Sequence, residues 1–181
     1  MKKDTNKKII IGFSIGDYNG IGPEILLKSF SDSKLLQNFI PVVFCDKHIL
    51  EYYSKRYGHE FKIKETNNLD SITDENSIYT FPISNSEIEI LPGEIKKESG
   101  NYAVKSLEEC TNAQINKKID GIVTLPISKI NSQSTKFPFP GHTEYFLEKF
   151  NVDDNMMIMH SEMMTIGFMT GHIPLDSIKS V

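Results

Sequence analysis

The chain has 181 residues, of which 39% are hydrophobic and 24% charged, and its formal net charge at pH 7 is −4. This length is enough for an ordinary domain with its own core, and the composition excludes the disordered and membrane-embedded classes of protein. The acidic balance, with Lys and Arg scattered among acids, argues against nucleic acid, whose phosphates need a concentrated basic surface.

Neither an export signal nor a membrane span is visible in the sequence. The apolar stretch Ile9 to Ile15 is followed by Gly-Asp-Tyr-Asn-Gly rather than by a cleavage site of small residues. No apolar run approaches the roughly 20 residues that cross a bilayer. Cys45 and Cys110 are too few for a disulfide framework and lie in apolar segments, so we expect buried free thiols. These features predict a cytoplasmic protein.

The pattern of apolar residues and turn signals predicts strands alternating with helices. We expect strands at 8–14, 40–45, 61–64, 78–83, 88–91, 120–125, 156–159 and 165–169. We expect helices at 23–30, 48–57, 101–118, 142–150 and from Pro174 onward, and a surface loop at 65–76. This alternation implies right-handed crossovers and a three-layer α/β/α fold with a mostly parallel sheet.

Two features near the end of the chain carry further expectations. The methionines around the last two strands, such as Met156 and Met163, are expected to fill a core. The helix that opens at Pro174 stops within about two turns and has no glycine cap. We therefore expect the intact protein to continue beyond Val181.

The first segment that could carry chemistry is Gly16-Asp-Tyr-Asn-Gly-Ile-Gly-Pro-Glu24, between the first strand and the first helix. Ligands of open parallel sheets bind beyond the carboxyl ends of the strands, where this loop is expected. Its glycines allow a backbone to approach closely, and free N–H groups at a helix start favour an anion. The segment is neither a dinucleotide fingerprint nor a P-loop. A tight turn needed only for packing explains it equally well.

Two further segments place polar side chains beside a strand end or a helix start. In Thr124-Leu-Pro-Ile-Ser-Lys129, the lysine could bind a phosphate or carboxylate or assist proton transfer, although a surface lysine is the plainer reading. In Phe139-Pro-Gly-His-Thr-Glu144, Thr143 could cap the helix that follows. His142 would then lie near the N–H-rich helix end, where an anionic substrate is favoured, or be an exposed histidine in a capping turn.

The fourth segment is Thr170-Gly-His-Ile-Pro-Leu175, in which a strand ends at a glycine and a histidine precedes a helix. His172 is a plausible metal ligand. A lone histidine is more often structural, and a catalytic metal usually takes about three protein ligands. His160 and Glu162, in the preceding turn, are weaker candidates.

Taken together and in this order, the four segments resemble the 4-hydroxythreonine-4-phosphate dehydrogenase family of pyridoxal phosphate biosynthesis. A Ser99-Gly100 turn before the long helix also fits, and the resemblance spans residues 9–181. The Gly-Ile-Gly-Pro-Glu sequence alone is shared with isocitrate and isopropylmalate dehydrogenases. The Pro-Gly-His-Thr-Glu sequence followed by His-x-Pro-Leu narrows the resemblance to this family.

The resemblance implies an isocitrate/isopropylmalate dehydrogenase-like fold, with residues 1–181 as the N-terminal portion of a two-domain α/β enzyme and the remainder following residue 181. It implies an NAD-dependent, metal-assisted oxidation, with decarboxylation, of 4-phosphooxy-L-threonine in vitamin B6 synthesis. The expected cofactors are NAD and a divalent metal (Zn, Mg or Co), and the expected assembly is a homodimer.

The resemblance also assigns roles to single residues. By the matching motifs, His142 and Thr143 bind substrate and His172 is a metal ligand. We further expect Asp17 to bind substrate and Lys129 to be catalytic. The other metal histidines, the rest of the substrate site and most NAD contacts are expected beyond residue 181. The four segments are expected to converge on one cleft.

Two local departures from the family pattern lie near this expected site. Tyr18-Asn19 stands where the family often has Pro-Ala, and Leu125 stands where it often has glycine. These departures leave open a sister dehydrogenase that acts on threonate or erythronate 4-phosphate. The absence of the later segments leaves open a third reading, an inactive truncated module that binds a ligand without turning it over.

Overall fold

The structure is a computed structural model that describes residues 8–31, 33–73, 76–84, 87–134, 137–170, 173–174 and 176–177. It divides into two compact units, Met1–Pro140 and Gly141–Val181, and each is described by itself. Within the described ranges, no helix is both long enough and apolar enough to cross a bilayer.

The first unit is built on a five-stranded sheet in which every neighbouring pair of strands is parallel. The strand order is β3-β4-β2-β1-β5. The strands are β1 (Ile9–Ser14), β2 (Phe39–Phe44), β3 (Ile63–Glu65), β4 (Ile78–Thr80) and β5 (Gly121–Thr124).

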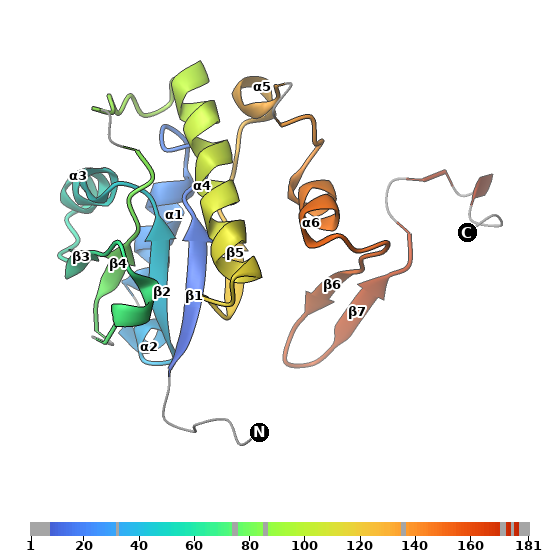
Figure 1. Cartoon of the computed structure of the whole chain (residues 1–181), viewed down its shortest axis with the longest axis horizontal. Coiled ribbons are helices and arrows are strands. Elements are labelled where there is room, and N and C mark those ends of the chain that lie inside the picture. Colours follow the sequence, from blue (N-terminus) through green and yellow to red (C-terminus); the bar gives the residue numbers. More distant parts are fainter. Residues whose placement is uncertain are drawn as a thin grey trace. The chain divides into compact units, whose positions relative to one another are not determined.

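Helices cover both faces of this sheet. Figure 1 shows α4 (Lys97–Ile115) in front of the strands and α1 (Gly22–Phe30) behind them, and α1 packs against α3 (Lys47–Tyr57). From β1 to β3 the chain moves one way along the sheet, and from β4 to β5 it moves the other way. Right-handed crossovers in opposite directions put their helices on opposite faces. The predicted three-layer α/β/α fold with a mostly parallel sheet is confirmed.

The core forms where the apolar runs predicted it. Val42 and Val43 in β2 are completely buried, because layers of helices cover both faces of the sheet. A buried hydroxyl ties α4 to the ends of two strands: Ser106 Oγ donates to the carbonyl of Phe44 (2.6 Å) and accepts from the amide of Ile15 (2.9 Å). Such buried bonds satisfy backbone groups that burial would otherwise penalise.

Both cysteines are free and buried, as expected. Burial raises the pKa of the Cys45 and Cys110 thiols, which keeps both thiols protonated and weakly reactive.

Several predicted boundaries are wrong. The long helix begins at Lys97 rather than Asn101, so Ser99 and Gly100 lie inside its first turns and not in a turn before it. The stretch 88–91 forms no strand, although its alternation predicted one. Two single-turn helices, α2 (Ser33–Leu36) and α5 (Lys129–Ser132), were not predicted.

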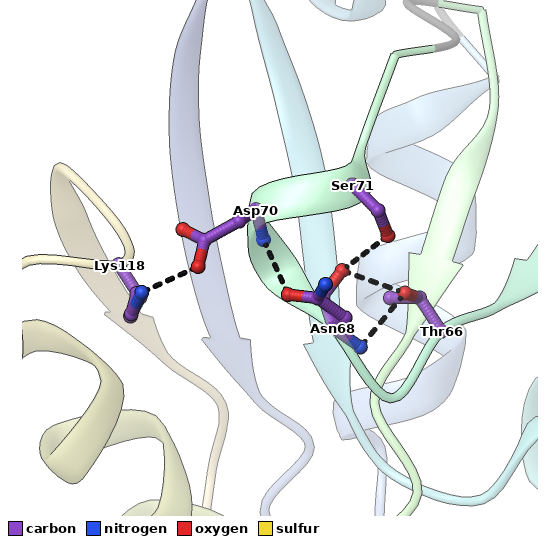
Figure 2. A network of polar contacts seen from close by, with 5 residues as sticks. All are labelled: Thr66, Asn68, Asp70, Ser71 and Lys118. Carbon is purple, nitrogen blue, oxygen red and sulfur yellow. Dashed lines mark hydrogen bonds and ion pairs between the residues drawn. The ribbon is translucent and has the colours of Figure 1, made fainter.

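The predicted surface loop at 65–76 contains an ordered turn, η1 (Leu69–Ser71). Figure 2 shows the polar contacts that hold it: the Asn68 side chain accepts from the amide of Asp70, and the Thr66 and Ser71 hydroxyls donate to the carbonyl of Asn68. Asp70 also pairs with Lys118, which lies just before β5. This network therefore ties the connection between β3 and β4 to the segment just before β5.

The second unit contains α6 (His142–Phe150) and an antiparallel hairpin of β6 (Met157–His160) and β7 (Thr165–Phe168). All three elements were predicted. The expectation that the methionines fill a core is wrong for the described residues, because Met156 is 60% and Met163 96% exposed. The helix expected from Pro174 lies mostly outside the described residues.

The packing of α4 on α5 predicts an unusual effect of a glycine substitution. Alanine is the better helix former by about 1 kcal/mol, so propensity alone predicts that Gly100→Ala stabilises the protein. A Cβ at this position, however, would overlap the backbone carbonyl of Asn131 in α5. We expect Gly100→Ala to lower the free energy of unfolding by about 1–3 kcal/mol, the usual cost of overpacking, as measured by urea unfolding.

The matched control is Gly121→Ala in β5, whose added Cβ would meet the flexible end of Ile11 at 3.4 Å. We expect a smaller loss there. A urea midpoint higher for Gly100→Ala than for the wild type would contradict the close contact between α4 and α5.

Candidate functional site

The loops that follow β1 and β5 lie directly against each other. Gly16 has a φ of +68°, which favours glycine, and a Cβ there would overlap the carbonyl of Pro126 in the loop after β5. The next amide, of Asp17, donates to that same carbonyl (3.0 Å). The structure thus brings together the glycine-rich segment and the segment that leads to Lys129, at the carboxyl ends of two adjacent parallel strands.

The Asp17 carboxylate is the centre of this region. Its side chain is only 5% exposed. Oδ1 accepts from the backbone amide of Asn19 (2.9 Å), and Oδ2 accepts from the Asn131 amide nitrogen (2.8 Å). Burying an ionised carboxylate is costly unless it receives hydrogen bonds, and these two donors meet that need. The role in substrate binding predicted for Asp17 stays a prediction, and its first contacts are within the protein.

Asn131 reaches three segments of the chain with one amide group. Besides Asp17, its Nδ2 lies 2.8 Å from the carbonyl oxygen of Lys96 and 3.2 Å from Ser99 Oγ, both at the start of α4. Asn131 and Ser99 are buried. The start of α4, the single turn α5 and the glycine-rich loop are therefore joined at one point.

Asn19, one of the two departures from the family pattern, fastens a further segment to the loop. Its side-chain oxygen accepts from the amide of Leu91 (2.8 Å), and its carbonyl accepts from the amide of Gly93 (2.7 Å). An alanine at this position could make only the backbone bond. The side chain of Asn19 therefore helps to hold residues 91–93 against the loop after β1.

Tyr18 is packed by two other tyrosines. Its ring meets Tyr102 edge-to-face, with ring centroids 5.2 Å apart, and its carbonyl accepts from the Tyr53 hydroxyl (2.6 Å). Burial raises the pKa of Tyr53 to about 12, so its hydroxyl remains a donor at neutral pH. Tyr102 in turn donates to Asp46 Oδ2 (2.7 Å). These contacts fix the aromatic ring that replaces the proline often found in the family.

A pocket of about 420 Å³ opens beside Tyr18. It is lined by Tyr18, Ser84, Glu87, Ile88, Glu89, Leu91, Lys96, Glu98 and Tyr102. Its three carboxylates outnumber its one cation, and that cation, Lys96, pairs with Glu94 (2.9 Å). This charge balance disfavours a phosphate in the pocket, because like charges repel.

The other residues predicted on the loop after β5 differ in exposure. Lys129 is the first residue of α5 and its side chain is exposed, so it can meet a ligand or solvent. Leu125 is buried, and it lies where a Cβ on Gly22 would approach it at 3.2 Å. Leu125 therefore packs under the start of α1.

In the second unit, His142 and Thr143 are the first two residues of α6. The expectation that Thr143 caps this helix is wrong, because the cap position is Gly141 and no side chain caps the helix. His142 Nε2 is buried and has no hydrogen-bond partner among the described residues. Burial lowers the pKa of His142, because the charged imidazolium loses hydration.

The metal site can be tested only in part. His172 lies outside the described residues, while Thr170 beside it lies within them. In the described part of the chain, no three His, Cys, Asp or Glu side chains are placed to hold a metal ion. His160 instead contacts Thr165 within the hairpin (2.7 Å). Convergence of the Gly141 and Thr170 segments with the first two stays a prediction, since they belong to the other unit.

Sequence reasoning missed Asn131, which the structure joins to Asp17, and it noted Ser99 only as part of a turn before the long helix. The signal was weak: an asparagine and a serine in polar stretches ordinarily indicate turns. The local sequence gives one hint: Asn131 follows a buried strand by a few positions and lies next to the apolar Ile130.

The environment of His142 predicts its titration. Its NMR midpoint in the folded protein should lie below that of the same histidine in the urea-denatured chain, because burial disfavours the charged form. The folded state then binds fewer protons than the unfolded state. The contribution of His142 to the free energy of unfolding is therefore present above the unfolded pKa of about 6.5. It is lost as pH falls through the lower folded pKa. An equal or higher folded midpoint would contradict this environment.

Comparisons with known proteins give the family of this chain. The family described as "Pyridoxal phosphate biosynthetic protein PdxA" matches residues 37–181. A relative from a Hydrogenobaculum species, named 4-hydroxythreonine-4-phosphate dehydrogenase, is 34% identical over 94% of this chain and 53% of its own length. One of the same name from Bacteroides thetaiotaomicron is 32% identical over 96% of this chain and 48% of its own length. The chain spans about half the length of these curated relatives.

A solved structure supports the fold. The X-ray structure of a 4-hydroxythreonine-4-phosphate dehydrogenase from Burkholderia phymatum superimposes with a TM-score of 0.87 at 24% identity. The match covers 97% of this chain and 54% of that one. At this identity the likeness shows the α/β fold alone, and the sequence match supplies the family. The chain belongs to the PdxA family of pyridoxal phosphate biosynthetic proteins.

Proposed function

We propose that the complete protein carrying this chain is an NAD-dependent dehydrogenase that oxidises 4-phosphooxy-L-threonine, with decarboxylation, in vitamin B6 synthesis. The observation that carries the proposal is the family match over residues 37–181, together with relatives named 4-hydroxythreonine-4-phosphate dehydrogenase. We further propose that it works in the cytoplasm as a homodimer. The activity is proposed for the complete protein because this chain spans about half of its relatives.

Each predicted site residue in the described part of the chain has a property that suits its proposed role. Lys129 is an exposed cation just beyond β5, where it can attract a phosphate or carboxylate and pass a proton. His142 has a buried Nε2 with no hydrogen-bond partner among the described residues and a lowered pKa, so near pH 7 its neutral ring can hydrogen-bond a substrate oxygen. The Thr143 hydroxyl lies in the first turn of α6, an end that favours anions. We propose that Asp17 acts on the substrate through the loop it holds.

The described residues supply no complete set of ligands for the expected divalent metal. A bound divalent ion would polarise the oxygen on the carbon being oxidised. The described residues do not fit such an ion on their own. We propose His172 as one ligand on the strength of its motif alone. The remaining ligands would come from residues outside this chain.

A sister activity on threonate or erythronate 4-phosphate is the second candidate. The observation that favours it is local: where the family often has Pro-Ala, the Tyr18 ring packs against Tyr102 and Asn19 fastens residues 91–93 to the loop after β1. This difference lies close to Asp17 and would alter the shape of the adjoining site. A non-catalytic ligand-binding module is the third candidate, and it predicts binding without turnover.

The complete protein should reduce NAD in the presence of 4-phosphooxy-L-threonine and a divalent metal. Chelation with EDTA should abolish the rate, and added metal should restore it. Each of the three phosphorylated hydroxy acids is assayed in parallel by NADH absorbance. A higher kcat/KM for threonate or erythronate 4-phosphate would replace the proposed substrate, and binding without NADH formation would favour the module.

In the same assay, His172→Ala should reduce both bound metal and rate, since losing one of about three ligands weakens a metal site sharply. His142→Ala should raise KM and lower kcat while bound metal, measured by elemental analysis, stays at the wild-type level. His48→Ala is the matched control, because His48 is exposed on α3. Unchanged metal content in His172→Ala would remove His172 from the ligand set.

A further inference from the structure

The amide of Asn131 makes more connections than its two N–H groups can serve separately. The oxygens of Asp17 Oδ2 and Lys96 lie 2.8 Å from Nδ2, and Ser99 Oγ lies at 3.2 Å. One N–H of Asn131 therefore donates to the Asp17 carboxylate and the other donates to the Lys96 carbonyl, with Ser99 Oγ as a further acceptor. The amide thus joins α5, which carries it, to the loop after β1 and to the start of α4.

The surroundings leave this amide little freedom. Asn131 is 9% exposed and Ser99 is completely buried. The backbone of α5 presses against α4 so closely that only a glycine fits at position 100. Position 131 is thus held by packing as well as by hydrogen bonds, and a side chain there points into a fixed polar environment.

The position of α5 matters because α5 carries Lys129. This helix is a single turn, Lys129–Ser132, and so has little stability of its own. Its attachment comes from tertiary contacts, and among these the Asn131 amide reaches both neighbours, the loop after β1 and the start of α4. We propose that Asn131 is a positioning residue, which holds Lys129 and the Gly16–Gly20 loop in one arrangement through its hydrogen bond to Asp17. This inference rests on the proposed function of Lys129.

The chemistry of the site singles out an asparagine. Alanine at position 131 would leave Asp17 Oδ2 and the Lys96 carbonyl without this donor. Aspartate has the same shape but would put a second carboxylate about 2.8 Å from the first. Two carboxylates at that separation share one proton, which raises the pKa of the pair. When protonated, the new carboxyl can donate to Asp17 as Asn131 does; when ionised, it repels Asp17.

The test is the pH profile of Asn131→Asp in the complete protein. At acidic pH its kcat/KM should approach that of the wild type, and with rising pH it should fall about 10- to 100-fold below it, mostly in kcat. Asn131→Ala should be impaired at every pH. The charged groups on the elements packed around position 131 are Asp17 on the loop, Lys129 on α5, and Lys96, Lys97 and Glu98 at the start of α4.

The matched control is Asn101→Asp, which adds the same charge at an exposed position of α4. Its profile should run parallel to that of the wild type. If Asn131→Asp were impaired equally at every pH, or ran parallel to the wild type, the positioning role would be overturned. A general loss of stability would lower activity without such a proton-dependent recovery.

Inactivity of the wild-type protein on all three substrates would overturn the proposed function. Thermal unfolding would then test the hydrogen bond between Asn131 and Asp17 independently of activity. In folded Asn131→Asp the pKa of the carboxylate pair is raised. The free energy of unfolding of this variant therefore falls as pH rises through that pKa. A melting temperature that falls with pH more steeply than in Asn101→Asp supports the bond, and parallel curves overturn it.

Should Asn131→Asp fold at no pH, the double variant Asp17→Asn with Asn131→Asp decides. It reverses donor and acceptor and removes the second charge. Like Asn131→Ala, this variant leaves the Lys96 carbonyl without its donor, so Asn131→Ala is the reference. A melting temperature above that of Asn131→Ala supports the pairing of the two side chains, and one at or below it overturns the pairing.

Discussion

The arrangement of loops at the carboxyl end of the sheet depends on one buried charge, the carboxylate of Asp17. Burying an ion costs several kcal/mol of free energy even after the protein relaxes, unless hydrogen-bond donors surround the ion. Here the donors are the backbone amide of Asn19 and the side chain of Asn131. Because one donor is local and the other comes from α5, the need to satisfy a single charge fixes two segments that are more than 100 residues apart in the chain.

The topology of the sheet explains why these segments can meet. β1 and β5 are neighbours, yet the chain leaves β1 for α1 on one face, whereas α4 reaches β5 from the other face. Loops that diverge at adjacent strand ends are the usual setting of ligand sites in open α/β sheets. In this chain the space is bridged by Asp17 and Asn131, and the exposed Lys129 stands at the start of the bridging turn. The fold and the buried charge together make a rigid base for the proposed site.

The sequence predicted the parts of this architecture that depend on periodicity. The buried strands β1, β2 and β5 and the amphipathic helix α4 follow from apolar runs and helical spacing, and the glycine-rich loop follows from its composition. Prediction from the sequence failed where tertiary contacts override the local conformational preference. Residues 88–91 alternate like a strand, but Asn19 takes the amide of Leu91 and no sheet partner is formed. The single turn α5 is too short to carry a periodic signal, and its tie to Asp17 spans most of the unit. Asn131 could not be found without the structure.

Amide hydrogen exchange in Asp17→Ala tests the central claim most directly. If the carboxylate organises the site, exchange should accelerate together in 16–21, in 126–132 and in the first turn of α4, while β2 and β4 keep the wild-type rates. The matched control is Asp70→Ala, which removes the exposed pair with Lys118, a pair that contacts none of those three segments, and should leave them unchanged. Acceleration confined to 16–21 would show that α5 and α4 are held by packing alone, and it would contradict the account.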